Sequence, residues 1–528
     1  MEKSIVGSKK ILKKEQVLIS VFLIAILVMS SGSLVAFAKS NTYVVKPNGV
    51  DDTADIQAAF NACGSTPGCT VQLVAGTYYV GQIAVLGFQG RFVGMGQGAT
   101  NIQALPNLPS PNLAYDTDTV PFWAALPTPA SVSGANPWPA LFTFVNGAFV
   151  ISGMTISEPY TATTCTTATP CPTLGWDDAV EQGSNPDTAL LAAIVITGET
   201  QSVTIDHLTV IATPANLVAA IFDIGLLLPE NWQKCVTGSP CALTDRIPLT
   251  GTFWLTNSLI IDNNPAIENV LNAVVTISHN TVEGNYAVVY LDDVSNSRIT
   301  ITGNKGIDIS YFTAVFAAQS VWIPGLLPST VYVTDNDFQV SEGANGVFIV
   351  DYGTPSTLSA VVTGNTIVTD TSCGCYTPEV PAIGADYADN LSSSSSLFIV
   401  SQNNILGGGS GVAFTGGPNT VLSDNRITGV MAGVVLGCYT VPGNCYSVLG
   451  FYTSASGAHV IGNVIKNSAQ YGIWVGAASS HNKIVGNFIT GTTPPPGGYD
   501  LYWDQTGTGN VWFGNFCGDH SSSPLGLC

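Results

Sequence analysis

The sequence predicts an all-β solenoid of stacked short strands, and two observations lead to this fold class. First, one phrase recurs along the second half of the chain: an apolar run, a small or polar residue, an asparagine and a second apolar pair. Second, its most closely spaced copies are 21 to 24 residues apart, a period typical of stacked repeats. The phrase occurs at Asn257, Asn280, Asn304, Asn336, Asn365, Asn404, Asn425, Asn463, Asn487 and Asn515.

Composition agrees with this architecture. Hydrophobic residues make up 46% of the 528 residues and charged residues only 9%, with 55 glycines, which suits many buried strands joined by turns and argues against disorder. The formal net charge is −20 at pH 7. Such a surface repels nucleic acid and anionic membranes, so neither is expected as a partner.

The first 38 residues read as a targeting segment. A lysine-rich leader precedes an apolar core at Val17–Met29 and a small-residue site at Ala36–Ala38, which is the pattern of a signal peptide. We therefore expect a secreted, extracellular or cell-surface protein with a single domain at 39–528 and no membrane contact after cleavage. Retention of the segment as an anchor stays open.

The cysteines also indicate export. All twelve fall into six close pairs, which predicts loop staples formed in an oxidising compartment. The predicted disulfides are Cys63–Cys69, Cys165–Cys171, Cys235–Cys241, Cys438–Cys445 and Cys517–Cys528. Cys373 and Cys375 are too close for a comfortable bridge, so their pairing is left open. Because no pair has the histidines or second CxxC that zinc would need, no metal site is predicted.

Near the start of the predicted domain, Asp52 or Thr53 can begin a helix that carries Ile56, Ala59 and Phe60 on one face. The phrases DDTADIQAAF and GTYYV resemble the pectate-lyase-like superfamily, as does the glycine-rich turn at 94–98 that follows them. The resemblance implies a single-stranded right-handed parallel β-helix whose first coil is covered by this helix, in a cap at about 41–65. A stapled tail at about 505–528 is expected to cover the other end, because open sheet edges invite aggregation.

Each coil is expected to contain an apolar strand and an asparagine-bearing strand. Parallel strands of successive coils are about 4.8 Å apart, so the asparagines should stack, each amide donating to the next coil. Longer gaps in the repeat become loops, the largest at 103–139, 158–187, 225–251, 370–396 and 436–457. Function usually resides in such loops and beside them.

Carboxylates follow several of the apolar strands. Asp351–Tyr352 and Asp386–Tyr387 look like the same position on successive coils, which would put their carboxylates roughly 5 Å apart. Asp292–Asp293 would lie two coils before Asp351, at roughly 10 Å. Carboxylates about 5 Å apart suit a retaining glycosidase and roughly 6.5–9.5 Å an inverting one. Aspartate is also a common turn former where strands end.

These residues define the predicted site. Asp292, Asp293, Asp351 and Asp386 are the candidate catalytic residues. Tyr352, Tyr387 and Arg298 are the candidate substrate-binding residues, and Arg298 is also a candidate base for a lyase.

Hydrolysis of an extracellular polysaccharide, with no cofactor, is the predicted function. One alternative is a non-catalytic β-helix that binds a cell-surface glycan or mediates adhesion; the other is a polysaccharide lyase, the only case in which Ca²⁺ is expected. The chain lacks the GHG and RIK motifs of polygalacturonase-like hydrolases and the DPHD motif of alginate-epimerase-like enzymes. The fold therefore does not choose among the three.

Overall fold

A computed structural model describes the chain from residue 41 onward with gaps, and its helix and strands all lie within Thr42–Cys528. The described residues are 41–105, 140–157, 190–211, 217–224, 226–227, 246–247, 250–262, 264–268, 270–284, 287–292, 294–310, 313–319, 327–341, 343–351, 357–369, 380–387, 396–416, 419–437, 454–494, 497–518 and 522–528. The predicted signal segment lies outside them. Within these ranges no helix has the length and hydropathy needed to cross a membrane.

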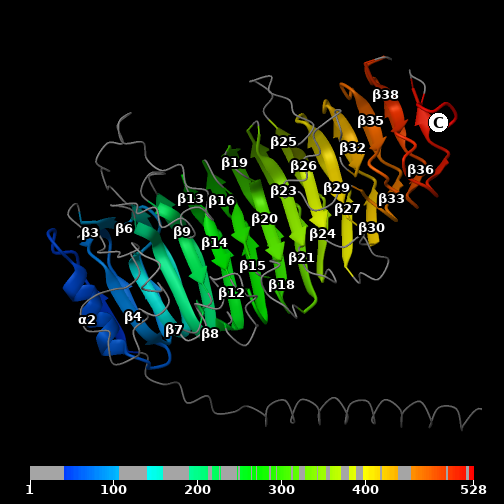
Figure 1. Ribbon diagram of the computed structural model, residues 1–528. Helices are drawn as coiled ribbons and strands as arrows, with labels where there is room; N and C mark the ends of the chain where they lie inside the picture. Colours follow the sequence, from blue (N-terminus) through cyan, green and yellow to red (C-terminus); the bar gives the residue numbers. More distant parts are fainter. Residues whose placement is uncertain are drawn as a thin grey trace, which may run out of the picture. The chain divides into compact units, whose positions relative to one another are not determined.

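The strands stack in three rows, and neighbouring coils pair in parallel throughout each row. The first row consists of β4 (Ile83–Phe88), β9 (Leu217–Ile224), β14 (Pro265–Glu268), β17 (Val289–Leu291), β20 (Thr313–Gln319), β23 (Asn345–Asp351), β26 (Pro381–Tyr387), β29 (Ser410–Thr415), β32 (Ala432–Leu436), β35 (Tyr471–Val475) and β38 (Tyr499–Trp503). Figure 1 shows these strands side by side. The second row consists of β1 (Thr42–Val45), β2 (Cys69–Leu73), β5 (Gly90–Val93), β12 (Thr250–Thr256), β15 (Ala273–Ser278), β18 (Arg298–Thr302), β21 (Ser329–Thr334), β24 (Leu358–Thr363), β27 (Leu397–Ser401), β30 (Asn419–Ser423), β33 (His459–Ile461), β36 (Lys483–Val485) and β39 (Val511–Phe513).

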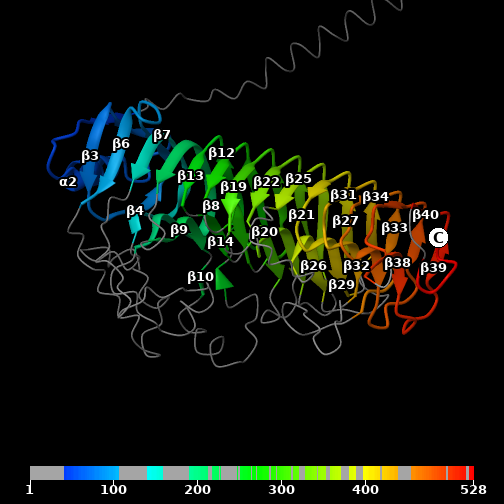
Figure 2. The same cartoon turned by 90° about the horizontal axis from the view of Figure 1, so that it is seen from above.

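The third row, seen across the coil from the first in Figure 2, completes each turn. It consists of β3 (Gly76–Val80), β6 (Thr100–Ala104), β13 (Leu259–Ile261), β16 (Thr281–Glu283), β19 (Lys305–Ile309), β22 (Asp337–Val340), β25 (Thr366–Thr369), β28 (Asn404–Leu406), β31 (Arg426–Thr428), β34 (Val464–Lys466), β37 (Phe488–Thr490) and β40 (Phe516–Cys517). Two long strands, β7 (Ala140–Ser157) and β8 (Leu190–Ile211), run through all three rows, while β10 (Leu226–Leu227) and β11 (Arg246–Ile247) form a separate antiparallel pair. The predicted all-β parallel β-helix is confirmed.

Alternation along the strands fills the inside of each coil with apolar side chains. On β23, for example, Val347 and Ile349 belong to the continuous interior core, whereas the intervening Phe348 does not. This period of two is what places every residue of a strand either inside or outside the coil. A shift of one residue in the pairing would therefore exchange the two faces.

The helix α2 (Thr53–Cys63) covers the interior of the first coil. Its Ile56, Ala59 and Phe60 are buried in the core, as the sequence predicts. The Phe60 ring contacts Phe88 at a centroid distance of 5.2 Å. A disulfide from Cys63, the last residue of the helix, to Cys69 fixes α2 to β2.

The predicted asparagine ladder is present at the turn between the second and third rows. The Asn304 side chain shows the repeating geometry: its Nδ2 donates to Asn336 Oδ1 at 3.0 Å and to Ile277 O at 2.9 Å. The Asn304 backbone N–H donates to the same Asn336 Oδ1 at 2.9 Å. Each buried amide therefore links three coils, which satisfies polar groups that would otherwise be stranded in the core.

Two assignments within the ladder are wrong by one residue. The ladder passes through Asn403 rather than Asn404, since Asn365 Nδ2 donates to Asn403 Oδ1. It also passes through Ser258 rather than Asn257, and the Ser258 N–H donates to Asn280 Oδ1. Asn257 instead occupies the preceding turn position, where φ is 50° and asparagine is among the few residues that adopt a left-handed conformation readily.

Two of the predicted disulfides lie among the described residues, and both are confirmed: Cys63–Cys69 and Cys517–Cys528. The second ties down a tail that adds to the last strand of the first row, since the Trp503 N–H donates to Ser523 O. The remaining cysteines lie outside the described residues: Cys165, Cys171, Cys235, Cys241, Cys373, Cys375, Cys438 and Cys445.

Candidate functional site

The outward face of the first strand row carries a line of large side chains. Tyr290, Phe316 and Phe348 occupy one register position on β17, β20 and β23. Their rings stack along the row, with centroids 4.8 Å apart for the first pair and 6.3 Å for the second. Each is 5–8% exposed and none belongs to the interior core. This line marks the face on which the predicted carboxylates must lie if they are to meet a ligand.

The predicted alignment of Asp351 with Asp386 is wrong by one residue. In the pairing of β23 with β26, Asp351 lies beside Tyr387, and Asp386 lies beside Val350. Because faces alternate along a strand, the two carboxylates are on opposite sides of the row. They therefore do not form a pair.

Asp351 lies on the inner side and is fully buried. Its Oδ2 accepts hydrogen bonds from the backbone N–H groups of Thr357 at 2.9 Å and Leu358 at 2.8 Å. This carboxylate therefore fixes the chain where it enters β24. The catalytic role predicted for Asp351 receives no support from this placement.

Tyr387 is also inside the coil, packed between Phe398 and Phe414. Burial, followed by the charge of Asp351, raises the pKa of Tyr387 well above its ordinary value. A fully buried phenol does not reach a polysaccharide, so this geometry does not support the predicted substrate-binding role. Tyr352 lies outside the described residues.

Asp386 is the predicted carboxylate that points outward yet is almost closed to solvent, at 5% exposure. Desolvation raises its pKa, against the opposing effect of the hydrogen bond that Thr415 Oγ1 donates to its Oδ1 at 2.7 Å. Its Oδ2 is buried without a hydrogen-bond partner. A carboxyl group of this kind tends to hold its proton and can act as an acid.

Asp292 directly follows β17 and is half-buried. Its backbone N–H donates to Ile267 O at 3.1 Å, and in a parallel pair this bond sets Asp292 beside Glu268 on the previous coil. Glu268 ends β14, directly after the core residue Ile267. The sequence analysis missed Glu268. The available signal was its position at the end of the strand PAIE, which matches the position of Asp292 after the strand VYL. Asp293 lies outside the described residues.

Asp292 and Asp386 share one register position but are far apart along the row. The chain of pairings from Asp292 passes through Ala318 and Val350 to Asp386, which is three coil steps. At about 4.8 Å a step their backbones are roughly 14 Å apart. This exceeds the carboxylate spacing of either glycosidase class, so these two do not act as one pair.

Arg298 lies on a different row. It begins β18 of the second row and is exposed, with its guanidinium 5.0 Å from the centre of the Tyr332 ring. A cation over an aromatic face is a stabilising surface contact. Arg298 is therefore not brought together with the carboxylates of the first row.

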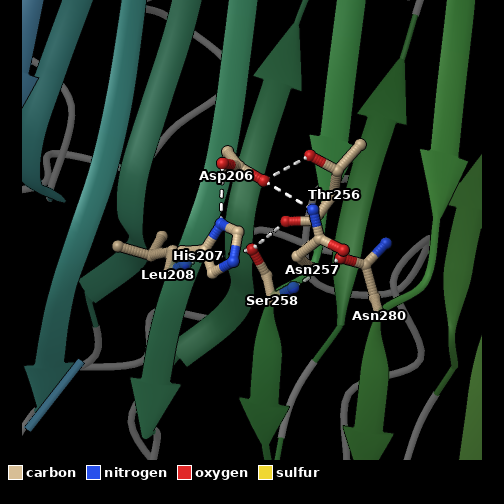
Figure 3. Close-up of polar contacts among 7 residues, drawn as sticks. All are labelled: Asp206, His207, Leu208, Thr256, Asn257, Ser258 and Asn280. Atoms are coloured by element: carbon tan, nitrogen blue, oxygen red, sulfur yellow. Dashed lines mark hydrogen bonds and ion pairs between the residues drawn. The ribbon is translucent and has the colours of Figure 1, made fainter. Parts of the chain in front are cut away.

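A polar cluster lies at the turn after the second row (Figure 3). Asp206 Oδ1 accepts hydrogen bonds from Thr256 Oγ1 at 2.7 Å and Asn257 Nδ2 at 2.8 Å, and its Oδ2 lies 2.7 Å from His207 Nδ1. Burial acts to raise the pKa of Asp206, but the contacts with Asn257, His207 and Thr256 outweigh it and the pKa lies below its ordinary value. His207 and Asn257 both have a left-handed φ, 52° and 50°, so the cluster joins equivalent turn positions of two successive coils.

A second group of aromatic rings covers the C-terminal part of the first row. Trp474 and Tyr502 stack at 4.3 Å, with Tyr471 against both and Tyr499 at 5.8 Å from Tyr502. Trp474 packs with Val435 in a cluster separate from the interior core, and the three tyrosines are half-exposed. These rings present an amphipathic surface of the kind that binds ligands with apolar faces.

One family model matches part of this chain. Residues 382–518 are similar to the family described as "Periplasmic copper-binding protein (NosD)". No curated protein matches the sequence.

Solved structures of similar outline cover most of the chain at low identity. The A-module of mannuronan C-5 epimerase AlgE6 from Azotobacter vinelandii is 15% identical over 90% of this chain and 97% of its own, with a TM-score of 0.34. The catalytic unit of a GH87 α-1,3-glucanase from Streptomyces thermodiastaticus is 13% identical over 91% and 69%, with a TM-score of 0.39. The PL6 polysaccharide lyase Pedsa3628 from Pseudopedobacter saltans is 10% identical over 90% and 92%, with a TM-score of 0.35.

The family description names copper. Across the described part of the chain no group of three or more His, Cys, Asp or Glu side chains could hold a metal ion. Within 382–518, Cys517 is committed to a disulfide. The described residues thus do not fit a copper site.

Proposed function

We propose that this protein acts on an extracellular polysaccharide at the outward face of the first strand row, and that it hydrolyses glycosidic bonds at Glu268 and Asp292. One observation carries the proposal. The hydrogen bond from the Asp292 N–H to Ile267 O pairs Asp292 with Glu268 on adjacent coils, and Asp292 is half-open to solvent.

The spacing supports this chemistry. Adjacent coils set the two backbones about 4.8 Å apart, and carboxylates about 5–5.5 Å apart suit a retaining glycosidase. In that mechanism one carboxyl group protonates the leaving oxygen while the other attacks the sugar and forms a covalent intermediate. Water then releases the sugar, with the first residue acting as base.

The surroundings of Asp292 favour a sugar over a peptide or a nucleic acid. Tyr290 precedes it by two residues on the same face and stacks on Phe316, and the two rings form an apolar surface next to Asp292. The net charge of −20 repels polyanions, so a neutral glycan is the expected substrate. The confirmed disulfides fit a periplasmic or extracellular location, consistent with the predicted secretion.

A second candidate is glycan binding without catalysis, and the cluster formed by Tyr471, Trp474, Tyr499 and Tyr502 favours it. This cluster offers three half-exposed tyrosine rings around the buried Trp474 on two successive coils, β35 and β38, far along the row from Asp292. Under this alternative the same protein would bind a glycan and release no product. The calcium-dependent lyase remains a third alternative.

Product analysis on a panel of neutral and acidic glycans tests the proposal. Asp292→Asn and Glu268→Gln should each lower the rate of reducing-sugar release about 10²–10⁴-fold, the usual contribution of acid–base groups. The matched control is Asp337→Asn, which removes the same charge from an exposed position on the third row and should keep full activity. Circular dichroism should show all three variants folded.

The alternatives give different results in the same assays. Binding to a glycan without product, and with affinity lost in Trp474→Ala, would favour the non-catalytic function. Chelator-sensitive release of an unsaturated uronide would favour the lyase. Full activity in folded Asp292→Asn would remove this residue from the site.

A further inference from the structure

One outer corner of the stack changes from polar to apolar along the chain. This corner is the ladder turn between the second and third rows, where outward side chains on both sides of the turn are in register from coil to coil. In five successive coils they are polar or charged: Thr302, Thr334, Thr363, Ser401 and Ser423 at the ends of the second-row strands, and Lys305, Asp337, Thr366, Asn404 and Arg426 at the starts of the third-row strands. In the next three coils the same positions hold six apolar residues, which we call the apolar corner: Ile461, Val485, Phe513, Val464, Phe488 and Phe516.

The apolar corner is exposed. Ile461 and Phe488 are each 40% exposed, Phe516 51% and Phe513 71%. Ile461 and Phe488 lie on coils that have a described coil on either side, so their exposure is sideways, away from the axis of the stack. An exposed patch of this kind, on a face where the preceding coils are polar, marks an interaction surface for a protein or a membrane.

The shape of the corner is convex and open. The turn residues between its two lines of side chains are Gly462, Gly486 and Gly514, all with a left-handed φ of 63–65°. A Cβ added to Gly486 or Gly514 would meet no atom within 4 Å. Figure 2 shows β31, β34 and β40 along this edge of the stack, opposite β26 and β29 of the first row. The apolar side chains therefore form a ridge and not a groove.

Cations lie on both sides of this ridge. Lys466 follows Val464 by two residues on the third row, and Lys483 precedes Val485 by two residues on the second row. Because faces alternate along a strand, both lysines are on the outward side. Both are exposed, and neither forms an ion pair within the described part of the chain. Their charges are therefore available to an anionic partner.

The acidic residues of the chain are concentrated elsewhere. The segment 426–518 contains three Lys or Arg and two acidic residues, Asp500 and Asp504, and so has a net charge of +1 against −20 for the whole chain. Asp500 is fully buried, and Asp504 follows β38 on the first row. Asp424, in the turn of the preceding coil, is balanced by Arg426 on the same coil. Since exposed charges are largely screened beyond about 8 Å at physiological ionic strength, the net charge of the chain does not govern this corner.

We propose that the apolar corner binds the surface of an anionic lipid bilayer. The ridge enters the boundary between headgroups and acyl chains, while Lys466 and Lys483 extend from its two sides to the lipid phosphates. A soluble acidic partner needs a groove shaped to receive the ridge, whereas a bilayer accepts a convex apolar surface without one. The proposal departs from the expectation of no membrane partner, which was drawn from the net charge of the whole chain.

Co-sedimentation with unilamellar vesicles tests this inference. The chain 39–528 is used, because it contains the helix and all described strands and lacks the apolar segment at 17–29, which would bind lipid by itself. Vesicles of equal parts phosphatidylglycerol and phosphatidylcholine should bind it at least about tenfold more tightly than vesicles of phosphatidylcholine alone. Phe488→Ser and Phe513→Ser should each weaken binding about tenfold. Lys466→Gln combined with Lys483→Gln should remove most of the preference for the anionic vesicles.

Matched controls separate the corner from the rest of the surface. Trp254→Ser removes an apolar side chain that is 48% exposed on β12 of the second row, and Lys305→Gln removes a cation from the polar part of the same corner. Both variants should bind vesicles like the parent chain, and circular dichroism should show every variant folded. In Phe488→Trp, the emission of the new indole should shift to the blue on binding and be quenched by lipids with brominated acyl chains.

Three outcomes would overturn the proposal. The first is a folded chain that binds neither kind of vesicle, and the second is unchanged binding in both Phe488→Ser and Phe513→Ser. The third is binding to poly-glutamate in solution without binding to vesicles, which would assign the lysines to a soluble acidic partner. None of these results depends on whether Glu268 and Asp292 are catalytic.

Discussion

At the N-terminal end of the stack, side chains of Asp52 and α2 hydrogen-bond to the edges of β3 and β4, whereas at the C-terminal end the described hydrogen bonds from the tail are main-chain bonds to β38. Gln57 shows the first arrangement, since its side chain both accepts from Ala84 N–H and donates to Ala84 O. In the second, the stapled tail pairs through Ser523 with Leu501 and Trp503, buries Leu527 in the core and is bonded through Cys528 to Cys517 of β40.

The difference shows that each strand row of a solenoid needs its own partner groups at the end of the stack. A helix lying across the coil covers the interior and offers side chains to several strands at once, as Asp52, Thr53 and Gln57 do. The tail makes one isolated parallel bridge to the first row and places Leu527 in the core. The first arrangement satisfies strand N–H groups with side chains, and the second does so with main-chain bonds and a disulfide.

The largest expected effect comes from removing the aromatic anchor of the N-terminal cap. Phe60 is 2% exposed and packs against Phe88, Phe92 and Phe144, so Phe60→Ala leaves a cavity and should cost about 3–5 kcal/mol of unfolding free energy. Urea unfolding monitored by tyrosine and tryptophan fluorescence measures it. Phe513→Ala, at 71% exposure, is the matched control and should change stability little. Equal losses would mean that the two ends are not different in packing.

The next effect sharpens the other side of the comparison. Replacing Cys517 and Cys528 with serine frees the tail and should cost about 2–3 kcal/mol by the loop-entropy model for a separation of 11 residues. Hydrogen exchange should become faster at Trp503, whose N–H donates to Ser523 O, while Tyr79 at the N-terminal end keeps its protection. Unchanged exchange at Trp503 would show that the tail stays docked without its staple.

Much of the fold was predictable because the repeated phrase shows which side chains of each coil are buried. Stacked asparagines and alternating apolar residues are both consequences of parallel coils, so they predicted the first row and the ladder. The single asparagine-bearing strand predicted for each coil was wrong, because the chain turns at the ladder residue and divides this segment into the second and third rows. The helix was predictable for a related reason, since Ile56, Ala59 and Phe60 share the face that enters the core.

The candidate site was harder because it depends on register to one residue. Asp351–Tyr352 and Asp386–Tyr387 share letters, but Asp351 pairs with Tyr387, and this shift sends one carboxylate inward and the other outward. The ladder shows the same ambiguity where Asn403 and Asn404 are adjacent and either letter satisfies the phrase. Only the hydrogen bonds of neighbouring coils decide between such choices, and sequence spacing does not contain them.

A smaller effect concerns the edge bonds of the N-terminal cap. Asp52 is fully buried and accepts from the N–H groups of Asn48 at 2.7 Å and Tyr79 at 2.9 Å, so Asp52→Ala strands two donors and should cost about 2 kcal/mol. Thermal unfolding at neutral pH measures the loss. The matched control is Asp51→Ala: this exposed residue accepts from Thr53 N–H near the same helix start and should cost less. A similar loss in both variants would assign the effect to helix capping and not to closure of the edge.

The smallest effect is expected at Asp386, which belongs to neither end. Burial raises the pKa of its carboxyl group, with the Thr415 hydrogen bond opposing the shift. In the unfolded chain this carboxyl group ionises once the pH passes the ordinary pKa of aspartate. In the folded protein it holds its proton to a higher pH. The contribution of Asp386 to the free energy of unfolding is therefore fully present at acid pH. It is lost as the pH rises from the ordinary pKa to the raised pKa.

Asp386→Asn removes this loss because the amide does not ionise and still accepts from Thr415. Relative to the parent protein, the variant should gain roughly 1–2 °C in melting temperature at pH 7 and nothing at pH 3, where both side chains are neutral. Melting curves of both proteins across this pH range make the measurement. A gain of equal size at both pH values would contradict the assignment to ionisation and would point instead to better packing of the amide beside Val350.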